Sequence, residues 1–289
     1  MNNKLLRATG VALFGGALIA LSSSGMAGIA NTKHNLGTTG TGTNHLTTGT
    51  AEICVFCHTP HGADTDAVVP LWNKSFTPGA YQTYDTLGTS SLDGAVAQVG
   101  SVSIACLSCH DGTQAMDTVI NAPGSGGYDP LGARMATDAD WAGSAFLNGT
   151  TITNIGTDLR NDHPVSIQYG GGGIDLTTHT VTGTASQSAA TLGDGDFVQP
   201  WGRLVNTNPV WWVETGAGSE RNKTDMQLYT RDGANTADVG GSWTGSAELQ
   251  PFVECASCHD PHVEDQGSNP TFLRISNDGS AVCLACHIK

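Results

Sequence analysis

The sequence predicts a chain of mostly irregular loops, with short helices at four repeated cysteine motifs and some β-strand in its middle region. Glycine supplies 38 of the 289 residues and charged residues only 13%, which is roughly half the usual charged share. Threonine, serine and asparagine replace the missing charges, so long helices are not favoured. The six tryptophans supply apolar mass that a disordered chain would lack.

The cysteines define the cofactor. All eight fall in four C-x-x-C-H motifs: Cys54, Cys57 and His58; Cys106, Cys109 and His110; Cys255, Cys258 and His259; Cys283, Cys286 and His287. This motif attaches c-type haem: both thiols bond to the porphyrin, and the adjacent imidazole binds the iron. Zinc or a redox dithiol is the alternative, but zinc does not require a histidine after every pair. The sequence therefore predicts four covalently bound haems c and the fold class of a multihaem cytochrome c.

Residues 1–27 have the features of a secretory signal peptide. Lys4 and Arg7 precede an apolar run that ends in small residues at Ala27, as in cleaved signals. An uncleaved anchor is the alternative, although the run is short for a membrane span. Haem c is attached outside the cytoplasm, which agrees with export. We expect a secreted protein, extracellular or at the cell surface, with the periplasm as the alternative.

Charge narrows the range of partners. Residues 1–27 contain two basic residues and no acidic ones, so their removal changes the net charge from −14 to −16. Such an acidic surface argues against nucleic acids and anionic membranes as partners.

The mature chain divides into three parts. Residues 28–112 contain a Gly/Thr-rich arm and the first haem pair, and residues 252–289 contain the second pair. Each pair begins with an extended motif, "CVFCHTPH" or "CASCHDPH", and ends with a plain C-x-x-C-H, which indicates a duplicated two-haem unit. Between them, residues 113–251 lack cysteine and contain alternating runs such as "HTVTG". These predict short strands in a β-rich middle region.

The extended motifs contain a second histidine. His61 follows His58 by three residues, and His262 follows His259 in the same way. Three residues cannot carry the chain around the edge of a porphyrin, so neither histidine can reach the far face of its own haem. Each is free to bind the iron of a different haem nearby. The preceding prolines restrict the backbone and keep this offset stiff.

Six histidines lie outside the C-x-x-C-H motifs: His34, His45, His61, His163, His179 and His262. His34 and His163 occupy short polar turns that can point an imidazole inward. His45 lies in a low-complexity Thr/Gly tract and His179 in an alternating run, so we expect both to have surface or structural roles. Met116, Met135 and Met226 are expected to pack rather than bind iron. The prediction is bis-histidine ligation throughout.

Several stretches together resemble a known family. They are "GIANTKHNLG", "ICVFCHTPHGA", "NDHPVS" and "CASCHDPH", followed by a C-terminal C-x-x-C-H. In this order they resemble the tetrahaem extracellular cytochrome nanowires, the outer-membrane cytochrome E-like multihaem cytochromes c. The resemblance covers both ends and part of the middle, and residues 113–251 are long for this family.

The resemblance implies a bis-histidine tetrahaem protomer that polymerises into a filament with one continuous haem chain. It also implies that one haem takes its distal histidine from a neighbouring subunit. The residues that match the family's distal ligands are His34, His61, His163 and His262. For the bridging ligand, His61 fits best, because it cannot serve its own haem. His34 is the second candidate, because a Gly/Thr-rich arm could reach across a junction.

The expected function is extracellular electron transfer, with further copies of the chain, redox cytochromes or extracellular acceptors as partners. A monomeric periplasmic electron shuttle is the first alternative, since it would use the same ligands. A multihaem oxidoreductase of the nitrite or hydroxylamine type is the second. Catalysis at haem requires an open or labile iron position, and six candidate histidines for four positions argue against one. We therefore do not expect an enzyme.

Overall fold

The computed structural model describes residues 28–65, 68–76, 80–124, 126–149, 151–163, 165–174, 183–187, 192–232, 249–263 and 270–288. The predicted signal peptide and His179 lie outside these ranges. Few helices and several strands are connected by long irregular segments, as predicted. In the part of the chain that is described, no helix has both the length and the hydropathy needed to cross a membrane.

The helices are short and lie at the cysteine motifs. The α-helices are α2 (Ser101–His110), α3 (Cys255–Cys258) and α4 (Ala281–Leu284), and Cys54 begins the 3-10 helix η2 (Cys54–Phe56). One helical turn places both cysteines of a motif on the same side of the chain. The other 3-10 helices are η1 (Gly28–Asn31), η3 (Tyr84–Leu87), η4 (Asp138–Asp140), η5 (Leu159–Asn161), η6 (Tyr169–Gly171), η7 (Pro270–Phe272) and η8 (Asp278–Ser280).

An antiparallel sheet of six strands occupies one end of the molecule. Its order is β5 (Ile167–Gln168), β10 (Leu249–Val253), β9 (Met226–Asp232), β8 (Asn208–Val213), β7 (Trp201–Val205) and β6 (Ser186–Gln187). Gly202 lies opposite Trp211 in this sheet, and a Cβ on Gly202 would come within 2.5 Å of the indole. Only glycine lets the Trp211 ring lie across β7.

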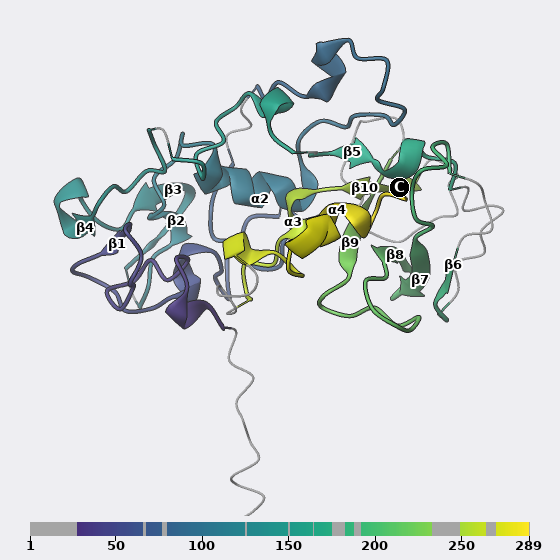
Figure 1. The fold of residues 1–289 in the computed structure, drawn as a ribbon. Helices are drawn as coiled ribbons and strands as arrows, with labels where there is room; N and C mark the ends of the chain where they lie inside the picture. The colour runs from purple at the N-terminus through teal and green to yellow at the C-terminus, as the bar shows by residue number, and fades with distance from the viewer. Residues whose placement is uncertain are drawn as a thin grey trace, which may run out of the picture.

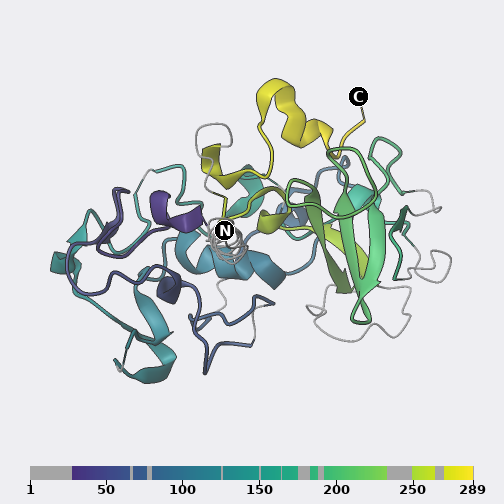
Figure 2. The same ribbon diagram turned by 90° about the horizontal axis from the view of Figure 1, so that it is seen from below.

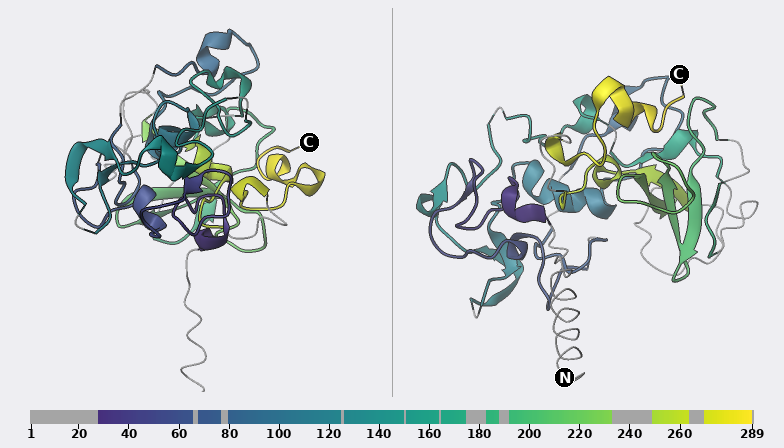
Figure 3. Two further views of the ribbon diagram at one scale, coloured as in Figure 1. Left: turned by 90° about the vertical axis from the view of Figure 1, so that its left-hand side faces the viewer. Right: turned by 60° about the horizontal axis from the view of Figure 1, so that its bottom comes forward.

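Two small hairpins occupy the other end. Strand β1 (His45–Leu46) pairs with β4 (Trp141–Ala142), and β2 (Thr118–Asn121) pairs with β3 (Tyr128–Arg134). Figure 1 shows β1–β4 at one end, the large sheet at the other, and α2, α3 and α4 between them. The C-terminal segment lies at the periphery when the molecule is turned (Figures 2 and 3).

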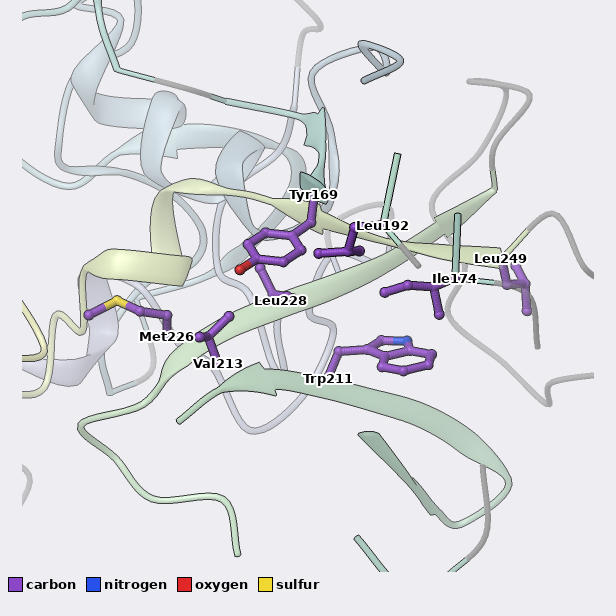
Figure 4. Close-up of a cluster of buried hydrophobic side chains, with 8 residues drawn as sticks. All are labelled: Tyr169, Ile174, Leu192, Trp211, Val213, Met226, Leu228 and Leu249. Carbon is purple, nitrogen blue, oxygen red and sulfur yellow. The ribbon is translucent and has the colours of Figure 1, made fainter. Parts of the chain in front are cut away.

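Each end has its own apolar core, and each core borders haem-motif cysteines. Beneath the large sheet, eight buried side chains pack together (Figure 4): Tyr169, Ile174, Leu192, Trp211, Val213, Met226, Leu228 and Leu249. Cys258 and Cys286 pack against this cluster. At the other end, a second cluster that includes Phe56, Met116 and Trp141 packs against Cys57 and Cys109. The haem motifs therefore border two apolar cores.

A buried polar network joins the first haem pair to the second. Glu254, immediately before Cys255, pairs with Arg231 at 3.0 Å and accepts hydrogen bonds from the hydroxyls of Ser103 and Ser166. The side chains of Glu254 and Arg231 are 0% and 3% exposed. Because a buried charge is costly unless it is paired, this network fixes how α3 packs on α2.

Candidate haem-binding site

The two extended motifs fold into the same local structure, as a duplicated unit would. In the first, the backbone N–H of Asn73 donates to Cys57 O at 2.9 Å, and that of Thr59 donates to Leu71 O at 2.8 Å. In the second, Arg274 N–H donates to Cys258 O and Asp260 N–H to Phe272 O, both at 2.8 Å. A returning segment therefore closes over each C-x-x-C-H motif in the same way.

The returning segment also orients the proximal imidazole. Nδ1 of His58 donates to Pro70 O at 2.9 Å, and Nδ1 of His259 donates to Thr271 O at 2.7 Å, each across 12 residues. His110 does the same with Thr153 O at 2.8 Å. A carbonyl can only accept, so the proton must be on Nδ1, and the lone pair of Nε2 is left for a metal.

Three of the four proximal histidines face a histidine from elsewhere in the chain. The ring centroids are 6.2 Å apart for His58 and His262, 6.2 Å for His110 and His34, and 5.7 Å for His259 and His163. Two imidazoles on opposite faces of one iron have centroids roughly 6 Å apart if each metal–nitrogen bond is about 2 Å. The residues present therefore fit bis-histidine haem at three motifs.

Four of these imidazoles are held in the neutral form that binds metals. Burial, and then the charge of His110, lower the pKa of His34 to about 4. Burial likewise lowers the pKa values of His58, His110 and His259. Neutral imidazole is the ligand form, so at neutral pH none of the four needs to lose a proton before it binds iron. His34 is further held by a stack on Phe272, with ring centroids 4.3 Å apart.

His61 and His287 differ from these pairs. Both are exposed, and among the described residues neither ring faces another imidazole. The carbonyl of His61 accepts hydrogen bonds from the Thr59 hydroxyl at 3.0 Å and the Asn121 amide at 3.2 Å. This holds His61 against β2. His287 lies beside Phe197, 4.3 Å between ring centroids. His287, a proximal histidine, and His61, a predicted distal ligand, therefore face no other imidazole among the described residues.

The cysteines of different motifs lie close together. The thiols of Cys106 and Cys255 are hydrogen-bonded, which raises the pKa of Cys106 and lowers that of Cys255. Burial, followed by the charge of Cys109, raises the pKa of Cys57 to about 12. Burial, followed by the charge of Cys258, raises the pKa of Cys286 to about 12. Each motif thus has a neighbour within electrostatic range of its sulfur atoms.

None of the eight cysteines forms a disulfide. Among the described residues, which include all eight cysteines, no three His, Cys, Asp or Glu side chains converge as a metal-ion site requires. The geometry therefore gives no support to a Cys₄ zinc site. His45 begins β1, and its Nδ1 donates to Gly42 O at 2.8 Å.

Two features of the site have no signal in the sequence motifs. One is the buried Glu254–Arg231 pair between the haem pairs. The other is Lys74, a buried lysine behind the first motif. Basic and acidic residues usually lie in solvent, so only the folded structure reveals these two features.

Comparison with known proteins agrees with this description. The family model of the doubled CXXCH motif matches residues 250–289, which contain the third and fourth motifs. No curated protein matches the chain. The motifs imply covalently bound c-type haem, and the match indicates a multihaem protein.

Proposed function

We propose that this haem-binding electron-transfer cytochrome carries four bis-histidine haems, acts outside the cytoplasm and polymerises head-to-tail into a conductive filament. Haem iron, when bound, supplies one-electron exchange between the ferric and ferrous states. The protein holds the ligands in place and keeps the carriers close together. With both faces of each iron occupied by imidazole, the role is transfer rather than catalysis.

One observation carries the proposal. After three imidazole pairs form within the chain, two histidines remain at the surface: His61, which could bind an iron, and His287, whose iron would lack a second imidazole. His61 is held against β2, at one end of Figure 1, whereas His287 forms a β-bridge with Phe197, which packs on the core of the large sheet. Among the described rings, His61 does not face His287 within the protomer. In a row of protomers, His61 of each copy would bind the iron above His287 of the next. Such a contact does not close on itself and produces an open filament.

The cysteine contacts support a continuous route through each protomer. Cys57 and Cys109 pack against one apolar cluster, and Cys258 and Cys286 pack against the other. Between them, the backbone N–H of Cys255 donates to the hydroxyl of Ser103, in the helix that contains Cys106, at 2.9 Å. These contacts link the four motifs in sequence order, so the first and fourth are the ends. The same two motifs hold His61 and His287. The ligand that joins protomers would therefore also join the ends of their haem chains.

The exposed His287 also favours a second candidate. A monomer would have one iron with an open distal position, which suits a soluble shuttle or a ligand-binding oxidoreductase. The spectrum of the iron in assembled and dispersed protein separates these functions.

In the assembled protein, we expect every haem iron to be six-coordinate and low-spin, since the neighbouring His61 completes the fourth site. Dispersed protomers should show about one quarter of the iron as high-spin. Electron paramagnetic resonance and optical spectra measure this, and negative-stain microscopy of the same samples reports the assembly. Wild-type protein that stays monomeric at high concentration would exclude the filament. A high-spin quarter that persists in filaments would favour the oxidoreductase.

The reduction potentials of most haems are expected to lie below zero on the hydrogen scale. Bis-histidine ligation lacks the stabilisation of ferrous iron that axial methionine provides. The net charge of −16 that remains without residues 1–27 also favours the ferric state. Potentiometric titration measures these values, and a majority of potentials above zero would contradict the ligand assignment.

A further inference from the structure

Lys74 is a buried cation without a local counter-ion. The residue is 1% exposed, and Nζ donates to the carbonyls of Ala115, Met116 and Thr118 at 3.2, 3.0 and 2.8 Å. The ammonium group has three N–H donors, so its hydrogen bonding is complete. Among the described residues, no carboxylate lies within ion-pairing distance of Nζ. Asp117, in the same loop, is engaged by Arg134 at 3.0 Å.

This charge lies directly behind the first haem motif. The neighbouring Asn73 donates from its backbone to Cys57 O and from its side chain to Val55 O at 2.6 Å. Trp72 forms a β-bridge with His58. Cys57 packs against the apolar cluster that contains Trp72. Lys74 is thus held one residue away from the backbone hydrogen bond between Asn73 and Cys57, whose sulfur bonds to the porphyrin.

The second unit provides an internal comparison. Ile275 takes the place of Lys74 there, and Arg274 takes the place of Asn73. The Arg274 guanidinium donates to Ala256 O at 3.1 and 3.0 Å and lies 3.6 Å from Asp260. Its charge is therefore partly offset by a carboxylate. The two motifs share one backbone structure and each has a largely buried cation nearby, but within the described ranges only the cation of the second motif has a carboxylate within ion-pairing distance.

We propose that Lys74 raises the reduction potential of the haem on Cys54 and Cys57 above that of its counterpart on Cys255 and Cys258. Reduction adds an electron to the haem, and a nearby positive charge stabilises the product. Solvent screens a buried charge only weakly, so the effect remains at physiological salt. The inference rests on haem binding in the proposed function but not on polymerisation. It places the more easily reduced of these two equivalent haems at the His61 end of the protomer.

The test is Lys74→Gln in the holoprotein, because glutamine is neutral and retains two N–H donors for the carbonyls. Potentiometric titration should show one reduction step moving to lower potential, with a roughly tenfold or larger change in the ferric-to-ferrous ratio of that haem. The other three steps should move less. Lys223→Gln is the matched control, since Lys223 is exposed and its loss should leave all four steps in place.

Haem-resolved NMR titration of the wild type provides a second reading that needs no variant. The haem on the first motif should be reduced at a higher potential than the haem on the third. The proposal is overturned if folded, fully haem-loaded Lys74→Gln titrates like the wild type, if all steps shift equally, or if the wild-type order is reversed. Mass spectrometry of attached haem separates these outcomes from failure of the proposed function, which would appear as a first motif without haem.

Discussion

Protomers with His61→Ala are expected to remain soluble, with every haem attached, at concentrations where the wild type forms filaments. The substitution removes the imidazole that would bind the neighbour's fourth iron, while the three imidazole pairs within the chain stay intact. About one quarter of the iron should become high-spin. Haem attachment should not change, because the C-x-x-C-H motifs are untouched. Negative-stain microscopy and sedimentation measure assembly, and optical spectra measure the spin state.

Two histidine variants serve as controls. His262→Ala removes the equivalent histidine of the second unit, which faces His58 within the chain. This variant should also produce high-spin iron but should still form filaments. His179→Ala should change neither property if that residue has the surface role expected from the sequence. Filaments of normal length from His61→Ala would show that His61 is not the bridging ligand.

Arg231→Met is expected to lower the free energy of unfolding by about 3–5 kcal/mol at pH 8, because it leaves the Glu254 carboxylate buried without its partner. The two groups are 3.0 Å apart and almost completely buried. Methionine retains most of the volume, so the loss should come from charge rather than from a cavity. Urea unfolding followed by far-ultraviolet circular dichroism measures it.

The decrease in the free energy of unfolding caused by Arg231→Met should be smaller at pH 5 than at pH 8. Burial raises the pKa of Glu254 to about 7, against an ordinary value of 4.5, although Arg231 lowers it. With a raised pKa in the folded state, the protonated carboxyl contributes stability that is complete below about pH 4.5 and is lost as the pH rises through 7. At pH 5 the carboxyl is neutral in both proteins, and the missing arginine leaves no buried charge.

The double variant Arg231→Met with Glu254→Gln tests whether the unpaired carboxylate of Glu254 causes the loss of stability. It should recover most of the stability at pH 8, because neither group is then charged. An equal loss at both pH values, or no recovery in the double variant, would show that Arg231 stabilises the protein through packing alone.

Sequence alone determines the chemistry that is local to a few residues. Cys54, Cys57 and His58 specify haem attachment wherever the chain places them, because both thiols and the imidazole belong to one turn. The three-residue step from His58 to His61 excludes ligation of the same iron, because the chain is too short to pass around a porphyrin. The second extended motif obeys the same limit, and the structure places His262 opposite His58 rather than on its own haem.

Only the tertiary structure decides which histidines meet. Nothing local pairs His110 with His34 or His259 with His163; these pairs depend on how distant segments pack around the two cores. His34 was the second candidate for the bridging ligand from sequence, yet in the structure it faces His110 in the same chain. The charges of Lys74 and Glu254 matter for the same reason. Burial depends on the whole fold, and the electrostatic interactions of a charge are stronger in a buried site because the dielectric constant is lower there.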